Sequence, residues 1–318
     1  MSDIDATTDF AVDLRAAARF VTLHARLLDR HRFALLLGRR ADSGEGDSDT
    51  GAVAARVLTA LDAYRNPDGG YGWGLEPDLR DGTSQPVGAL HAFEVLHEVA
   101  ARHADPIVHD RASTLCDWLA AVSLADGGLP FALGVRDRTG CAPWWADADT
   151  TTSSLHITTA VAAAAHRLAE HVPAMREHPW LRSATRYCLA NIEAMEHGHA
   201  YELRYAIDFL DAVHDSVPAA SEQLRRLGAL IPPSGVLPVA GGVESEALRV
   251  LDIAPWPDRP ARSLFAPDVV RAELVRLASL QHDDGGWPVG WATVSAGSEL
   301  EWRGALTVRA AALVVVNA

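Results

Sequence analysis

Two aspartates separated by a single residue could carry out acid–base chemistry. Asp147 and Asp149 belong to the segment Asp-Ala-Asp-Thr-Thr, which precedes an apolar segment with helical spacing. Burial raises the pKa of a carboxyl group, and a second carboxylate nearby raises the pKa of one member of the pair further. Such a pair could keep one carboxyl protonated, with Thr150 or Thr151 fixing its geometry by hydrogen bonding. The same residues are typical of a helix N-terminus, so a simple helix cap is the alternative.

A second acidic segment follows the first glycine turn of the chain. Glu76, Asp78 and Asp81 lie close together there, next to Arg80. Carboxylate oxygens are the ligands that Mg²⁺ prefers, so these three side chains predict a magnesium site for a diphosphate head group. The alternatives are a polar clamp on a substrate and a turn that Arg80 stabilises by pairing with one of the acids.

Aromatic and basic side chains near the turns are candidate substrate contacts. The chain contains nine tryptophans, and aromatic faces can stabilise a cation without reacting with it. His156 follows the aspartate pair and could hydrogen-bond to it, although a lone histidine there is more often a core residue. Arg204 and Arg303 could meet a phosphate or pair with buried acids. The expected substrate-binding residues are Tyr71, Trp73, Phe131, Trp144, Trp145, His156, Tyr201, Arg204, Trp291, Trp302 and Arg303.

Helices must position these side chains, because strand signals are scarce. Apolar residues recur with helical spacing through most of the chain. The segments are Leu14–Leu37, Ala52–Tyr64, Val87–Ala101, Ala112–Val122, Thr158–Glu170, Leu181–Met195, Leu203–His214, Pro267–Leu280 and Leu306–Val316. Residues 39–50 are rich in Gly, Ser and Asp and are expected to form a mobile loop. The pattern predicts an all-α chain.

Glycine turns separate the helical segments at a regular period. Asp-Gly-Gly occurs at positions 68–70, 126–128 and 284–286, and Ser-Gly occurs at 234–235, with a weaker His-Gly-His turn at 197–199. Gly69 and Gly285 lie 216 positions apart, or four steps of 54. Such a period indicates one repeated supersecondary unit, here helix, turn and helix. We expect about five to six helical hairpins in a single domain over residues 1–318.

Two of these turns resemble the repeats of a known superfamily. The segment Leu277–Trp287 resembles the QW repeat of squalene and terpene cyclases, and Arg65–Gly72 resembles the matching repeat of protein prenyltransferase β subunits. The resemblance implies an α/α toroid around a central cavity. It also implies that Gln281 and Trp287 tie outer helices together rather than act in catalysis.

Within this superfamily, the aspartate pair resembles the DxDTT variant of the class II terpene cyclase motif. The resemblance implies a protonation-initiated cyclase acting on a linear polyprenyl substrate such as a prenyl diphosphate. It makes Asp149 the general acid, with Asp147 and Thr150 as its tuning partners, and makes Mg²⁺ a candidate cofactor. One alternative is a non-catalytic toroid that binds a lipid or a protein. Another is a carbohydrate-active toroid enzyme with Glu76 or Asp78 opposite Asp149 across a wide polar groove.

Composition excludes several other classes. The net charge of −14 argues against nucleic-acid binding, because phosphates must be met by Lys and Arg. Cys116, Cys141 and Cys188 show no paired spacing, so neither zinc nor a disulfide framework is expected. No apolar run is long enough to span a membrane, and the polar N-terminus is not a secretory signal. We therefore expect a cytoplasmic protein, and the Ala- and Arg-rich usage suggests a bacterial source.

Overall fold

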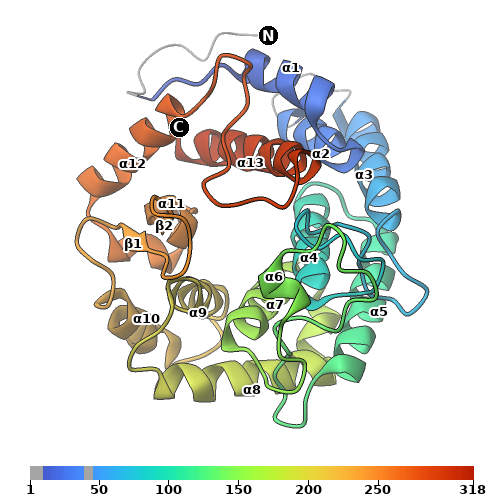
Figure 1. Ribbon diagram of the computed structural model, residues 1–318, viewed down its shortest axis with the longest axis vertical. Helices are drawn as coiled ribbons and strands as arrows, with labels where there is room; N and C mark the ends of the chain where they lie inside the picture. Colours follow the sequence, from blue (N-terminus) through green and yellow to red (C-terminus); the bar gives the residue numbers. More distant parts are fainter. Residues whose placement is uncertain (1–9, 39–45) are drawn as a thin grey trace.

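The helices form a closed ring of two concentric layers (Figure 1). The computed structural model describes residues 10–38 and 46–318. The outer layer consists of α1 (Leu14–His24), α3 (Gly46–Asp62), α5 (Pro106–Val122), α8 (Pro179–Ala194), α10 (Ala220–Gly228) and α12 (Pro267–Ser279). The inner layer consists of α2 (Leu27–Gly38), α4 (Pro86–Ala100), α7 (Leu155–Leu168), α9 (Ala200–Ala212), the short α11 (Val250–Ile253) and α13 (Ala296–Asn317). This is the expected α/α toroid.

Short elements lie in the connections between the layers. They are α6 (Pro143–Ala146), the 3₁₀ helices η1 (Pro173–Glu177) and η2 (Pro260–Leu264), and a hairpin of β1 (Leu237–Pro238) and β2 (Ala247–Leu248). In the hairpin, Leu237 pairs with Leu248 in antiparallel register. The expected loop at 39–50 is wrong over its last residues, because α3 begins at Gly46, and residues 39–45 lie outside the described residues.

The Asp-Gly-Gly turns share one conformation, which explains the sequence period. Gly69, Gly127 and Gly285 have φ values of +93°, +91° and +92°, which favour glycine. In each turn the next glycine donates its N–H to the Oδ1 of the preceding aspartate, at 2.9–3.0 Å. Each turn also packs against the next outer helix. A Cβ on these glycines would lie about 3 Å or less from backbone atoms of Thr114 in α5, Ser183 in α8 and Ala16 in α1, respectively.

The last turn closes the ring onto the first helix. Gln281 accepts a hydrogen bond from the N–H of Asp13 and donates one to its carbonyl, both at 2.9 Å. Asp13 is the N-cap of α1, so Gln281 ties the final turn to the start of the outer layer. Trp287 is buried and donates its indole N–H to the carbonyl of Leu277. Both side chains therefore make structural contacts, in line with the role inferred from the resemblance.

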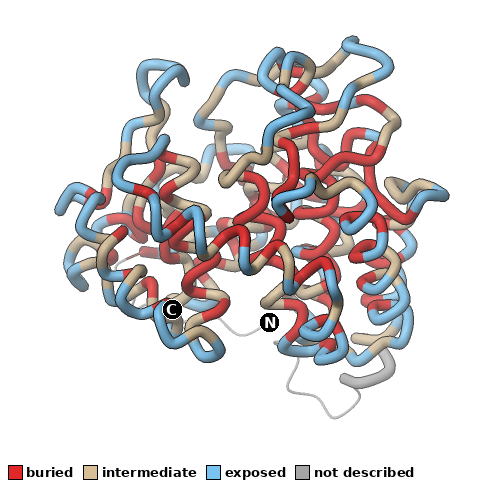
Figure 2. The backbone as a smooth tube through the Cα atoms, turned by 90° about the horizontal axis from the view of Figure 1, so that it is seen from below, coloured by how far each residue is buried: buried red, intermediate tan, exposed pale blue. Residues whose placement is uncertain are grey.

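Alanine and leucine form the core between the two layers. Buried residues are concentrated in the middle of the molecule and exposed residues at its periphery (Figure 2). Helix α7 contributes an almost unbroken run of buried small residues, Ala160–Ala165, and packs against α4, α8 and α9. Small side chains allow neighbouring helices to approach closely. Among the described helices, none is both long and apolar enough to cross a membrane.

Candidate functional site

The Asp-Ala-Asp-Thr-Thr segment lies on the surface between α6 and α7. Asp149 Oδ1 accepts hydrogen bonds from the N–H of Thr151 at 2.8 Å and from its hydroxyl at 2.6 Å. These bonds, with one from Thr152, lower the pKa of the exposed Asp149 carboxyl to about 2. Asp147 ends α6 and pairs with Arg138, and 64% of its side chain is exposed. Thr150 is exposed as well.

The expected buried, coupled pair is therefore wrong. A proton donor for an alkene needs a carboxyl whose pKa is raised by burial or by a second carboxylate, whereas hydrogen bonds stabilise the ionised form of Asp149. The helix-cap alternative does not hold either, because Ser154 is the N-cap of α7 and accepts from Ile157. Asp149 instead closes a local turn with Thr151, an arrangement that short polar side chains favour in loops.

The three acids of the second segment point to three different partners. Glu76 bonds to His91 on α4. Asp78 accepts from the indole N–H of Trp302 at 2.7 Å and from the N–H of Val294 at 3.3 Å. Asp81 accepts from Thr83 and from two backbone N–H groups in the loop before α6, those of residues 136 and 137. The described residues contain no group of three or more His, Cys, Asp or Glu side chains that could hold a metal ion. The magnesium site expected at Glu76, Asp78 and Asp81 is therefore wrong.

This acidic loop instead joins the beginning and the end of the ring. Arg80 forms two 2.9 Å hydrogen bonds with the carboxylate of Glu301, in the second turn of α13. Arg26, which directly precedes α2, donates to the carbonyls of Gly74 and Leu75. The loop thus fixes α2, α4 and α13 relative to one another, and Glu76 is its only acid that reaches a titratable side chain on an inner helix.

His91 lies between two carboxylates. Its Nε2 is 2.9 Å from Glu76 Oε2 and its Nδ1 is 3.0 Å from Glu94 Oε2. Burial opposes protonation of His91, but the two acceptors outweigh burial and raise its pKa to about 9. Burial likewise opposes ionisation of Glu94, but the contact with His91 outweighs it and lowers the pKa of Glu94 to about 2. His91 is therefore a cation and Glu94 an anion at neutral pH.

Glu94 combines depth in the molecule with access to solvent. It lies on the inner layer and is surrounded by protein, yet 48% of its side chain is exposed. Because outer helices cover the inner layer from outside, this exposure comes from the interior of the ring. Glu98, 31% exposed, accepts from Arg32 of α2 at 2.7 Å and 2.8 Å. We call this surface, which also includes Tyr205 and Arg204 of α9, the inner face.

A row of aromatic rings extends from α6 to α9 and meets the inner face at Tyr205, which lies near Glu94. Phe131 stacks on Trp145 with ring centroids 4.5 Å apart, and His156 follows at 5.3 Å from Phe131. Tyr201 and Tyr205 continue the row, with centroids 5.5 Å and 5.0 Å from His156. We call these five rings the aromatic wall. Four of them, Phe131, Trp145, His156 and Tyr201, are among the expected substrate-binding residues, and the structure brings them together.

Of the remaining expected residues, Arg204 contacts the wall by donating to the hydroxyl of Tyr205 at 3.1 Å, and the others lie apart from it. Trp291 and Trp302 contact each other edge to face, with centroids 4.9 Å apart, and Trp302 lies against His91. Trp144 and Trp73 are exposed on the surface, and Tyr71 is fully buried in the core. Arg303 pairs with Asp284 beside Trp287, and Arg204 donates to the carbonyl of Asp252, so each already has protein partners. The expected phosphate contacts at these arginines are thus not supported.

Five residues of the site were missed by sequence reasoning: Arg32, His91, Glu94, Glu98 and Tyr205. The sequence of α4 does contain a pattern that indicates three of these residues. His91, Glu94 and Glu98 recur at i, i+3 and i+7 in a helix that is otherwise almost wholly apolar. A narrow polar stripe on such a helix indicates that one face meets solvent inside the protein.

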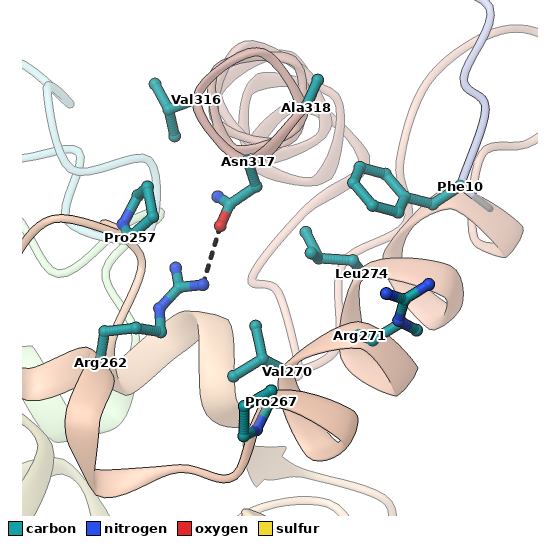
Figure 3. Close-up of a pocket in the computed structure, with 10 residues that line it drawn as sticks. All are labelled: Phe10, Pro257, Arg262, Pro267, Val270, Arg271, Leu274, Val316, Asn317 and Ala318. Carbon is teal, nitrogen blue, oxygen red and sulfur yellow. Dashed lines mark hydrogen bonds between the residues drawn. The ribbon is translucent and has the colours of Figure 1, made fainter. Parts of the chain in front are cut away.

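A separate groove of about 530 Å³ lies away from the inner face, between α12, η2 and the end of α13 (Figure 3). It is lined mainly by apolar side chains such as Phe10, Val270 and Leu274. Its Arg262 donates to Asn317 Oδ1 at 2.8 Å and to the carbonyl of Pro255 at 2.7 Å. None of the expected site residues lines this groove.

Comparison with known proteins defines the fold class. No protein-family model matches the chain, and no curated protein matches its sequence. The type II terpene cyclase MstE from Scytonema, in its apo form, has a TM-score of 0.51 at 12% identity, covering 95% of this chain and 97% of that chain. A variant of MstE in complex with its substrate, geranylgeranyl dihydroxybenzoate, has a TM-score of 0.50 at 12% identity over the same shares. A GH76 α-mannanase from Bacteroides thetaiotaomicron has a TM-score of 0.52 at 11% identity, covering 98% of this chain and 89% of that chain.

The chain therefore has a terpene cyclase-like α/α-toroid fold. At 11–12% identity the likeness concerns the fold alone. The two neighbours carry out unrelated chemistry, so the fold does not define the function of this chain.

Proposed function

We propose that this toroid is a carbohydrate-active enzyme that binds a hydroxyl-rich ligand on its inner face and acts on it through Glu94. One observation carries the proposal: Glu94 is an ionised carboxylate that His91 holds in place while nearly half of its side chain stays open to solvent. A carboxylate in this state can act as the nucleophile in glycoside cleavage, in which a second acid protonates the leaving-group oxygen and water then hydrolyses the glycosyl ester to regenerate the carboxylate.

The charge of the inner face favours a polar ligand over a hydrocarbon. Arg32, Glu94, Glu98 and Arg204 all belong to this surface. An isoprenoid chain laid on these groups would remove water from them without returning hydrogen bonds, which is costly. The hydroxyl groups of a sugar can replace that water, and the aromatic wall offers flat apolar surfaces to the less polar faces of sugar rings.

Glu76, His91 and Glu94 form a hydrogen-bonded series that fixes the positions of the charges on this surface. Glu76 is buried and anchored in the acidic loop, so it orients His91 and favours the imidazolium. The imidazolium in turn fixes one oxygen of Glu94, which leaves the other for a ligand. This is the arrangement by which a supporting residue preorganises a reacting carboxylate.

An isoprenoid cyclase is the second candidate. The aromatic wall, together with the ionised Glu94, could stabilise a carbocation, and the terpene cyclase neighbour supports the suitability of the architecture. The proton donor would then have to be a group other than Asp149, whose ionised form is favoured.

A product assay separates the two candidates. The purified chain is incubated with gluco-, manno- and galacto-oligosaccharides and, in parallel, with farnesyl and geranylgeranyl diphosphate, with and without Mg²⁺. We expect cleavage of an oligosaccharide that is lost in Glu94→Gln and retained in Glu244→Gln, a matched change at an exposed carboxylate of the β1–β2 hairpin. Conversion of a prenyl diphosphate, with no oligosaccharide cleaved, contradicts the proposal and favours the cyclase. Binding of an oligosaccharide without cleavage contradicts the enzymatic part and leaves a binding protein.

A further inference from the structure

His156 occupies the middle of the aromatic wall. It is the second residue of α7, and its ring is nearly parallel to those of Tyr201 and Tyr205, with interplanar angles of 4° and 22°. Phe131 lies against it from the loop before α6. Three aromatic residues from two different segments thus hold the imidazole in one orientation.

The ring nitrogens of His156 have no protein partner among the described residues, whereas the neighbouring hydroxyls do. Tyr201 donates to Glu246 at 3.1 Å, and the hydroxyl of Tyr205 accepts from Arg204 at 3.1 Å. His156 itself makes only ring contacts. Neither of its nitrogens is among the fully buried polar atoms without a partner, and the residue keeps partial exposure. The imidazole is therefore held rigidly with its polar atoms still within reach of a ligand.

The imidazole is also neutral. Burial, followed by the charges of Arg204 and His199, lowers the pKa of His156 to about 3. A neutral imidazole carries one N–H donor and one acceptor nitrogen. It therefore suits an uncharged group that can both donate and accept, such as a hydroxyl.

We propose that His156 is the specificity-determining residue of the inner face and that it selects a ring-shaped, uncharged ligand by hydrogen-bonding one of its hydroxyl groups. This inference rests on the proposed function and narrows it to a neutral sugar ring bound against the aromatic wall. A ligand without that hydroxyl would cover His156 and leave its nitrogens unpaired, which is the situation in which a polar site rejects an analogue strongly.

Binding measurements on a ring-preserving variant test the assignment. His156→Phe keeps an aromatic ring in the wall and removes both nitrogens. His24→Phe is the matched control, because His24 is an exposed histidine that contacts Phe20 on the outer helix α1. Isothermal titration calorimetry of the wild type against the three oligosaccharide series identifies the tightest ligand. That ligand and its monodeoxy analogues are then titrated into both variants, and melting temperatures verify that the variants fold.

The expected result is a dissociation constant raised roughly 10- to 100-fold in His156→Phe and unchanged in His24→Phe. One deoxy analogue should bind weakly to the wild type and lose no further affinity in His156→Phe. Equal affinity of wild type and His156→Phe for every ligand overturns the inference while the proposed function stands. A variant that weakens all analogues equally also overturns it, because the loss would then come from packing. If the wild type binds no oligosaccharide, the proposed function fails as well.

Discussion

Replacing Glu76 by glutamine should lower the pKa of His91 and the stability of the protein together. A rise of the His91 pKa from 6.5 to about 9 corresponds to roughly 3 kcal/mol in favour of the imidazolium. Glu76 and Glu94 both contribute to this rise in the His91 pKa. Solvent screens Glu76 less than Glu94, because 7% of the Glu76 side chain is exposed and 48% of the Glu94 side chain. We therefore assign about 2 kcal/mol to Glu76. In a chain of this length, that loss should lower the melting temperature by roughly 3 °C.

The loss of stability in Glu76→Gln should depend on pH. The folded pKa of His91 is raised, so the stabilisation is complete below about pH 6.5 and is lost as the pH rises through about 9. The difference in melting temperature between wild type and Glu76→Gln should therefore be largest near pH 6 and small at pH 10. Thermal melts across this range, with an NMR titration of the imidazole C–H signals, measure both quantities. Asp147→Asn, which removes an exposed ion pair, is the control and should change little.

Two results would refute this reasoning. One is an NMR midpoint for His91 near 6.5 in the wild type. The other is a His91 midpoint near 9 in both the wild type and Glu76→Gln, which would show that Glu76 does not influence the pKa of the imidazole.

Other predictions follow from single positions. Gly285→Ala should lower the melting temperature by more than about 5 °C, because φ is +92° and a Cβ would lie 2.2 Å from the carbonyl oxygen of Ala16. Gly290→Ala, with no atom within 4 Å of its Cβ, should change it little in the same calorimetric scan. Trp73 has φ of +57° and is 60% exposed, so Trp73→Asn, which tolerates this conformation, should leave the melting temperature nearly unchanged; a large drop would show that the indole is needed for folding. Asp149→Asn should leave turnover unchanged in a steady-state assay, because the carboxyl is exposed and ionised, and a loss of turnover would restore its catalytic role.

The turns made the ring predictable from the sequence. Asp-Gly-Gly recurs because the backbone needs positive φ at the first glycine and because no Cβ fits against the next outer helix. These are local requirements, so they leave a local and repeated signature. The first hairpin carries no such signature, since α1 and α2 are joined at Ala25 with ordinary extended backbone. The sequence pattern there reads as one long helix from Leu14 to Leu37.

The chemistry of the candidate site was less predictable, because it depends on contacts between distant segments. Glu76 and Asp78 are two residues apart, yet one meets α4 and the other meets α13, 224 residues away in the case of Trp302. Proximity in sequence suggested one metal site, whereas the fold separates the two acids. Asp149 was misinterpreted for the related reason that a motif gives residue types but not burial, and burial decides whether a carboxyl is an acid or an anion.

The aromatic wall was partly predictable. Aromatic residues near the glycine turns suggested a lined cavity, and Phe131, Trp145, His156 and Tyr201 do meet. Tyr205 has no such turn beside it and was missed, although it follows Tyr201 by one helical turn on the same face of α9. A search for aromatic residues three or four positions from each candidate residue in a predicted helix would have found Tyr205.

The most direct test of the central claim compares Glu94→Gln with Asp149→Asn under identical conditions. The measurement is kcat/KM for the best oligosaccharide of the product assay, with melting temperatures to verify that both variants fold. The account predicts a loss of at least about 10²-fold in Glu94→Gln and a value within about twofold of the wild type in Asp149→Asn. The opposite pattern, with activity lost in Asp149→Asn and kept in Glu94→Gln, would contradict it and return the active site to the surface turn between α6 and α7.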